Sequence, residues 1–103
     1  MKKIITRKVY NTETAELIGK YWNGLSTNDF HYVYEELYIT KKGSWFLYYS
    51  GGALSKYGES GYGRGWGTEG IIPLESEEAY KWLERNDCHE AIEKYFSDKL
   101  EEA

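Results

Sequence analysis

The strongest pattern in the chain is the alternation of side chains in two neighbouring segments. In residues 31–39 the odd positions hold His, Val, Glu, Leu and Ile, and the even positions hold three tyrosines and one Glu. Residues 44–50 alternate in the same way, with Trp, Leu and Tyr on one side and Phe and Tyr on the other. Alternate positions of an extended chain face opposite sides of a sheet. The sequence therefore predicts two paired strands joined by a turn at residues 40–43, where glycine supplies positive φ.

Neither face of this predicted hairpin is polar. One face is apolar, and the other is rich in tyrosine, which combines an apolar ring with a polar hydroxyl. We expect helices to cover one face. The other face is expected to be partly exposed, or to be covered by the glycine-rich segment that follows.

The residues before the hairpin predict one strand and one helix. Residues 3–10 mix branched side chains with Thr, Lys and Arg, which suits a strand. Asn11 and Thr12 can cap a helix, and Asn23-Gly24 can end it. Between them, apolar side chains recur at helical spacing at Leu17, Ile18, Tyr21, Trp22 and Leu25. We expect this helix to lie on the sheet.

The residues after the hairpin predict a short strand and two helices. Residues 70–74 read as a strand that Pro73 limits to an edge or an end of a sheet. Ser76 can cap a helix that ends near Asn86. Asp87, followed three residues later by Glu90, resembles the capping box of a last helix.

The predicted order is β-α-β-β-β-α-α, an α+β fold with a small, mainly antiparallel sheet and helices packed on one face. The length of 103 residues predicts a single domain, 1–103. Within it, residues 1–74 form a sheet-forming body that contains a glycine-rich loop, 51–70. Residues 75–103 form acidic C-terminal helices.

Charge is unevenly distributed along the chain. The net charge is -4, but residues 75–103 hold four Lys or Arg against ten Asp or Glu, which leaves the body slightly basic. A single cysteine, Cys88, allows no internal disulfide. No segment approaches the apolar length of a signal peptide or a membrane span. These features predict a cytoplasmic protein.

Candidate catalytic residues are few, and the sequence predicts neither an enzyme nor a cofactor or metal site. The two histidines, His31 and His89, belong to no ligand-spaced or catalytic motif. Cys88 and His89 are adjacent on a predicted helix and therefore point in different directions. Glu35 interrupts an apolar alternation, which allows a general base beside His31, a salt bridge at a sheet edge, or a pairing with Arg7 or Lys8.

The segment 51–70 holds eight of the eleven glycines. It contains GxGxG but lacks GK[ST] and runs toward a strand, so it does not fit a phosphate-binding loop. It also holds cations and aromatic rings suited to a contact surface, although the same rings could simply cap the tyrosine face of the hairpin. These residues are Lys56, Tyr57, Tyr62, Arg64 and Trp66.

Three stretches of the chain carry a family resemblance. They are KKIITRKVYNTETAELIG near the start, DFHYVYEELYITKKGSWFLYYSGGALSKY in the middle and IIPLESEEAYKWLE toward the end. From Lys2 to about Glu84, the chain resembles a segment found at the N-terminus of small proteins from mobile elements of Firmicutes. Proteins with this segment include plasmid and conjugative-element anti-CRISPR proteins that inhibit type II CRISPR systems.

The resemblance implies a stoichiometric inhibitor in the cytoplasm of a bacterial host cell. Such a protein binds a type II Cas effector nuclease, or its guide-bound complex, and blocks engagement of guide or target DNA without chemistry of its own. The expected partner-binding residues are the five in the glycine-rich segment, with Glu35 and Glu36 as weaker candidates. No cofactor, metal or membrane is expected. A homodimer through an exposed strand edge is compatible with the sequence.

Two alternatives remain at this stage. In the first, the protein binds RNA or cleaves guide RNA, with Glu35 and His31 acting on the RNA; the net negative charge and the lack of a sizeable basic patch weigh against it. In the second, it is a non-catalytic interaction module that acts on another host defence nuclease.

Overall fold

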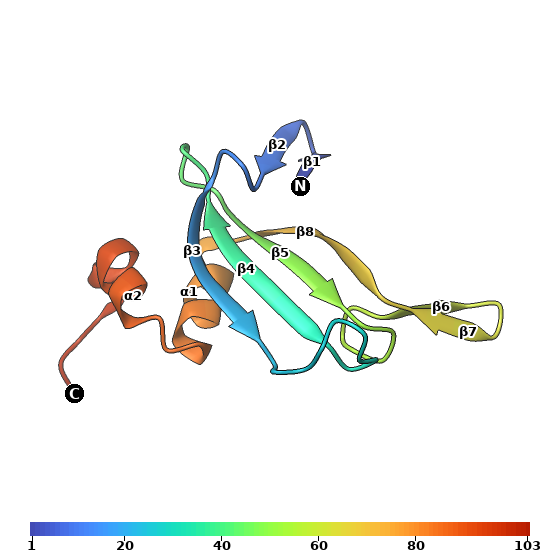
Figure 1. Ribbon diagram of the computed structural model, residues 1–103. Coiled ribbons are helices and arrows are strands. Elements are labelled where there is room, and N and C mark those ends of the chain that lie inside the picture. The colour runs from blue at the N-terminus through green and yellow to red at the C-terminus, as the bar shows by residue number, and fades with distance from the viewer.

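The computed structural model describes residues 1–103, and its centre is a four-stranded antiparallel sheet (Figure 1). In spatial order the sheet contains β3 (Glu16–Trp22), β4 (Val33–Ile39), β5 (Trp45–Gly51) and β8 (Thr68–Leu74). Two separate hairpins are formed by β1 (Lys2–Ile5) with β2 (Lys8–Asn11), and by β6 (Glu59–Gly61) with β7 (Arg64–Trp66). The chain then continues through α1 (Ser76–Arg85), α2 (His89–Tyr95) and the 3-10 helix η1 (Ser97–Lys99).

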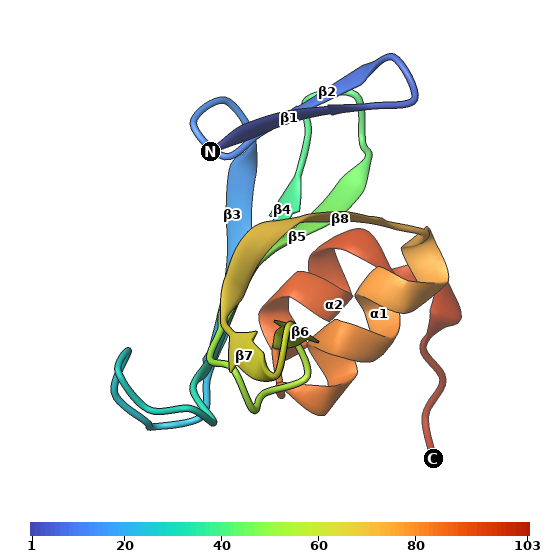
Figure 2. The same ribbon diagram turned by 90° about the vertical axis from the view of Figure 1, so that its right-hand side faces the viewer.

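The predicted fold class is confirmed, because a mainly antiparallel sheet is followed by C-terminal helices on one of its faces (Figure 2). The predicted central hairpin is also confirmed. Its strands β4 and β5 pair from Ile39 opposite Trp45, next to the turn, to Val33 opposite Gly51 at the far end. None of the helices combines the length and apolar character that crossing a membrane requires.

The predicted helix between residues 12 and 23 is wrong. Asn11 does not cap a helix; its side chain accepts the Glu13 N–H at 2.9 Å and closes a tight turn into β3. A bulge between Leu17 and Gly19 interrupts the pairing of β3 with β4. Such a bulge shifts the two-residue alternation by one position. The apolar residues on either side of it, such as Leu17, Ile18 and Tyr21, therefore fall at spacings that also fit a helix. The predicted strand over residues 3–10 is likewise a hairpin of two short strands.

One face of the sheet packs against the helices. Its core comprises buried side chains from β4, β5, α1 and α2, in which Trp45 stacks on Phe96 with ring centres 5.5 Å apart. A Cβ at Gly19 would lie 3.0 Å from the Trp82 ring, so this glycine lets β3 approach α1 closely. The other core members are Leu37, Leu47, Ala79, Trp82, Leu83 and Ile92.

The opposite face is the tyrosine-rich one that the alternation predicts. Tyr38 stacks on Phe46 with ring centres 5.1 Å apart, and Tyr10 of β2 contacts Phe46 edge-on. The β1–β2 hairpin therefore covers one end of this face, while Tyr34 and Tyr48 stay half-buried. The glycine-rich segment is not the cover, so that part of the expectation is wrong.

The helix ends differ from the predicted caps. Glu75, not Ser76, is the N-cap of α1, and its N–H donates to Glu78 at 2.8 Å. Asp87 does not begin the last helix. It adopts φ 54° after α1, and the N–H of Cys88 donates to the Leu83 carbonyl at 3.0 Å, a helix-ending arrangement.

The turn of the β1–β2 hairpin is strained. Thr6 and Arg7 have φ of 50° and 66°, the left-handed region that Asn and Gly favour in two-residue hairpin turns. A left-handed residue with a Cβ costs roughly 1–2 kcal/mol.

We predict that Thr6→Asn combined with Arg7→Gly raises the free energy of unfolding by about 1 kcal/mol, because relief of backbone strain exceeds the entropic disadvantage of glycine. Urea unfolding measures the change. Lys41→Gly is the control: Lys41 has no positive φ, so glycine there should destabilise slightly. A double variant less stable than the natural protein would contradict the assignment of strain.

Candidate functional site

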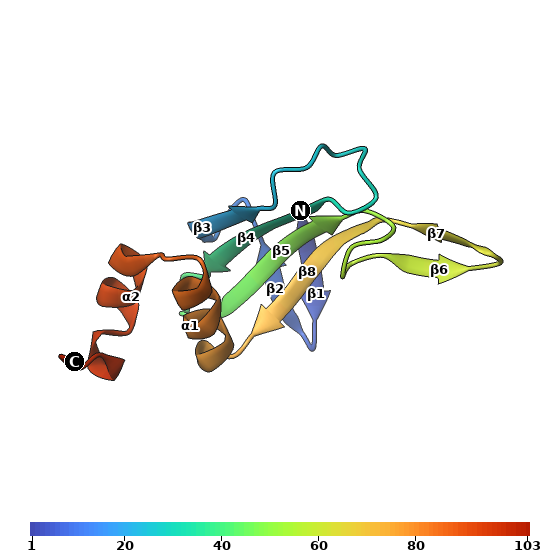
Figure 3. The same ribbon diagram turned by 90° about the horizontal axis from the view of Figure 1, so that it is seen from below.

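The glycine-rich segment divides into two parts with different structural roles. Residues 52–58 fold back against the end of the sheet, whereas residues 59–66 leave it as the β6–β7 hairpin (Figure 3). The five contact residues predicted in this segment are therefore divided: Lys56 and Tyr57 lie in the first part, and Tyr62, Arg64 and Trp66 lie in the second.

The first part is held tightly by backbone contacts. The Gly52 N–H donates to the Tyr32 carbonyl at 2.9 Å, and the Leu54 N–H donates to the Phe30 carbonyl at 2.7 Å. A Cβ at Gly52 would lie 2.5 Å from the Asp29 carbonyl oxygen. Gly52 is therefore needed because two backbone segments approach closely here, and its role does not require a ligand.

Glu35 of β4 is the buried charge of the structure, with 3% of its surface exposed. One carboxylate oxygen accepts the Trp82 indole N–H at 2.8 Å. The other accepts the Tyr57 hydroxyl and lies 2.8 Å from the Lys56 ammonium. The Tyr57 ring also stacks on Tyr49 with centres 4.2 Å apart. Glu35, Lys56, Tyr57 and Trp82, the Glu35 network hereafter, thus join a strand, a loop and a helix.

Electrostatics in this network favour the ionised carboxylate. Burial by itself would raise the pKa of Glu35, but the contacts from Lys56, Tyr57 and Trp82 together outweigh it and lower the pKa below the usual value. Burial, followed by the contact with Glu35, raises the pKa of Tyr57 well above that of a free tyrosine. Glu35 is therefore a hydrogen-bond acceptor with its acceptor sites in use, rather than a base waiting for a proton.

The network also decides between the predicted partners of Glu35. The proposed pairing with Arg7 or Lys8 is wrong, because the ion pair is with Lys56. A sheet-edge salt bridge is wrong too, since β4 is an inner strand. His31 lies exposed before β4, where its N–H donates to Asp29, and no hydrogen bond or ion pair joins it to Glu35.

Glu36 faces the opposite side of the sheet. Its two carboxylate oxygens accept the hydroxyls of Tyr34 and Tyr38, the latter at 2.7 Å. Burial, and then the bond to Glu36, raises the pKa of Tyr34 to about 12. Glu36 therefore orders the tyrosine face and is separated from the Glu35 network by the thickness of the sheet.

The other catalytic candidates are not brought together. The Cys88 thiol lies 3.6 Å from the Asn86 carbonyl, and burial, followed by the charge of Asp87, raises its pKa. A raised pKa reduces the thiolate fraction that a nucleophile needs. His89 instead lies 3.7 Å from the Asp87 carboxylate. No group of three His, Cys, Asp or Glu side chains is placed to hold a metal ion.

The β6–β7 hairpin, residues 59–66, extends away from the sheet as a narrow two-stranded ribbon (Figure 1). Its turn places Tyr62 and Gly63 at φ of 52° and 78°. The Tyr62 side chain is fully exposed, with no contact that shields it. Arg64 is exposed beside the turn, and Trp66 is 43% exposed with its ring near Gly61. The hairpin is therefore an exposed extension of the molecule that carries two aromatic rings and one cation.

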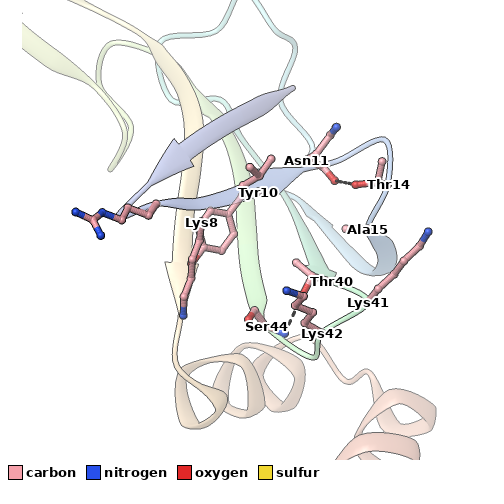
Figure 4. A pocket seen from close by; sticks show the side chains of 11 residues that line it. Lys8, Tyr10, Asn11, Thr14, Ala15, Thr40, Lys41, Lys42 and Ser44 are labelled. Atoms are coloured by element: carbon pink, nitrogen blue, oxygen red, sulfur yellow. Dashed lines mark hydrogen bonds between the residues drawn. The ribbon is translucent and has the colours of Figure 1, made fainter.

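Sequence reasoning missed one further feature, a basic cleft between the β1–β2 hairpin and the β4–β5 turn (Figure 4). The cleft has a volume of about 610 Å³ and is lined by four cations, Arg7, Lys8, Lys41 and Lys42. These residues form two short pairs far apart in the sequence, so neither pair reads as a basic patch. The docking of the β1–β2 hairpin on the sheet, in which Tyr10 contacts Phe46, brings the pairs together.

We predict that Glu35→Ala lowers the free energy of unfolding by about 3 kcal/mol, because it leaves the Trp82 N–H and the Tyr57 hydroxyl without their buried acceptor. Glu36→Ala is the matched control on the same strand. Of its two tyrosine partners, Tyr38 is buried but Tyr34 is half-buried and can turn to water, so the expected loss is smaller, about 2 kcal/mol. Equal losses for the two variants would contradict the special role of Glu35.

The same network predicts a pH dependence. Because the folded pKa of Glu35 is lowered, its contribution is fully present above the pKa of an unfolded glutamate, about 4.3, and is lost as the pH falls through the folded value. Glu35→Gln should remove this part of the acid slope in denaturant titrations below about pH 4.3. An unchanged slope would show that Glu35 is not preferentially ionised in the folded state.

Comparison with known proteins provides no family for this chain: no family model, no curated protein and no solved structure matches it.

Proposed function

We propose that the protein acts by binding, as a stoichiometric anti-CRISPR inhibitor that engages a type II Cas effector nuclease and blocks guide or target DNA engagement. The choice of target rests on the resemblance described above. The choice of surface rests on one observation, the fully exposed Tyr62 at the positive-φ turn of the β6–β7 hairpin.

Tyr62 is unfavourable for the isolated molecule in two ways. Its backbone is left-handed at φ 52°, where Asn or Gly would avoid a cost of roughly 1–2 kcal/mol. Its ring is fully exposed and stabilises no intramolecular core. Residues with a strained backbone cluster at functional sites.

The neighbours of Tyr62 support the same interpretation. Arg64 and Trp66 follow on the same hairpin, and Tyr, Trp and Arg are the residue types most enriched among binding hot spots. The base of the hairpin is fixed, because the Thr68 hydroxyl donates to the Tyr57 carbonyl at 2.6 Å beside the Glu35 network. A hairpin with a fixed base loses less conformational freedom when it binds.

The remaining predicted contact residues have a supporting role in this proposal. Lys56 and Tyr57 both bond to Glu35, and Glu36 accepts hydrogen bonds from two tyrosines. The acidic helices offer a second surface, since exposed acids can occupy a channel that normally takes nucleic acid. The hairpin is therefore the specific contact, and the acidic face adds long-range attraction.

A cleavage assay tests the proposal. Purified protein is mixed with type II effectors before or after guide RNA, and target DNA cleavage is followed while the molar ratio is varied. Stoichiometric inhibition predicts that cleavage is lost near one inhibitor for each effector. No binding and unchanged cleavage across several effectors would contradict the proposal. Shortened guide RNA in the presence of a divalent metal would favour a guide-cleaving enzyme instead.

We predict that Tyr62→Gly and Trp66→Ala each weaken effector binding by about 2 kcal/mol, roughly thirtyfold, because each removes an exposed aromatic anchor. Tyr62→Gly should leave the fold at least as stable, since glycine accepts positive φ. Phe30→Ala is the control, because Phe30 is also an exposed ring, at 65%, but lies outside the hairpin. Titration calorimetry and thermal unfolding separate the two effects.

Weaker inhibition that simply follows lost stability would mean that the hairpin is structural. If Phe30→Ala weakens binding as much as the hairpin variants do, the contact surface is elsewhere. A pull-down that enriches a different host defence nuclease, without any CRISPR component, would identify the protein as an interaction module with another target.

A further inference from the structure

The basic cleft lies at the opposite end of the central β4–β5 hairpin from the β6–β7 hairpin. Lys41 and Lys42 belong to the turn that follows Ile39, whereas the glycine-rich segment begins where β5 ends at Gly51. Figure 4 shows Lys8 on one side of the cleft and Lys41 on the other, with Tyr10 between the two hairpins. The cleft is therefore independent of the surface proposed for the effector.

The charges of the cleft are not compensated within the molecule. No carboxylate lines it, and none of its four cations takes part in an ion pair. Acids are nevertheless the more numerous charged residues in the chain, at 17 Asp or Glu against 13 Lys or Arg. Two smaller pockets that border the cleft contain Glu75 and Glu16, but neither residue lines the cleft itself. Four uncompensated cations around one cleft give it a positive potential that favours an anionic ligand.

The neutral residues of the cleft add hydrogen-bond donors. Asn11, Thr40 and Ser44 contribute amide and hydroxyl groups to the lining, whereas the Thr14 hydroxyl already donates to the Asn11 carbonyl. Cations combined with neutral donors are the usual recognition set for phosphate oxygens, and Arg in particular can bind two of them at once. The backbone of Arg7 is in the left-handed region, at φ 66°. Glycine would adopt this turn conformation at lower cost, so the presence of Arg here suggests a use for its side chain.

From these observations we propose that the cleft binds the phosphodiester backbone of a nucleic acid. A nucleic-acid strand carries a charge at every residue, about 3.4 Å apart along a helix axis, and so can meet several cations in one cleft. An acidic peptide matches this charge density only where nearly every residue is Asp or Glu. The acidic helices lie on the other face of the sheet from the β1–β2 hairpin, so they do not obstruct the approach of a polyanion (Figure 2).

The test measures binding of fluorescein-labelled oligouridine by the full chain, using fluorescence anisotropy between about 50 and 200 mM salt. With four phosphate contacts, the slope of log affinity against log salt should be about -2.8, since each contact on a single strand contributes about -0.7. Lys41→Gln combined with Lys42→Gln should bring the slope to about -1.4 and weaken binding at least about tenfold at the lower salt. Arg7→Gln combined with Lys8→Gln should do the same from the other hairpin.

The matched control is Lys81→Gln combined with Lys94→Gln, which changes the net charge equally but on exposed helix positions. The control should retain the natural affinity and slope. Equal losses for control and cleft variants would show an effect of net charge alone and overturn the proposal. Tighter binding of a fluorescent polyglutamate peptide than of oligouridine would also overturn it. The proposal would likewise fail if inorganic pyrophosphate displaced the labelled oligouridine while the cleft variants bound it as tightly as the natural protein does.

Discussion

The buried carboxylate of Glu35 is the constraint on which the rest of the structure depends. A charge that is 3% exposed is tolerated only if each oxygen finds donors, and here the donors come from α1 and from the start of the glycine-rich segment. The carboxylate thus ties Trp82 of α1 and residues 56–57 to the same point of the sheet. The β6–β7 hairpin follows this anchored loop directly, so the Glu35 network, together with the bond from Thr68 to the Tyr57 carbonyl, holds the base of the hairpin.

The sequence predicted well wherever the signal was local and repeated. The two-residue alternation of residues 31–50 gave the central hairpin, its turn and the contrast between its faces. The capping signals at Ser76 and near Asn86 gave the extent of α1 to within one residue. The same reasoning failed in β3, because a bulge beside Gly19 disturbs the alternation and produces a helical pattern by coincidence. The need for Gly19 comes from Trp82, more than sixty residues away, and no local pattern reports it.

The candidate sites show the same limit. Glu35 stood out in the sequence as a polar residue in an apolar alternation, but its partners Lys56, Tyr57 and Trp82 come from three-dimensional packing. The glycine-rich segment was recognised as one unit, although its glycines perform two tasks. Gly52 and Gly58 permit close backbone approach, whereas Gly63 completes a left-handed turn. The basic cleft was invisible because its cations lie in two distant dipeptides.

The bulge in β3 has a second consequence, which concerns the borders of the sheet. β3 and β8 are the outer strands, and their unpaired backbone groups could template the addition of another chain. The bulge breaks the regular spacing of those groups along β3, and Pro73 removes one N–H from β8. Both borders are therefore poor templates for a further strand. A small domain with many tyrosines and a mainly β architecture is in this way protected against ordered self-assembly by irregularities in its own outer strands.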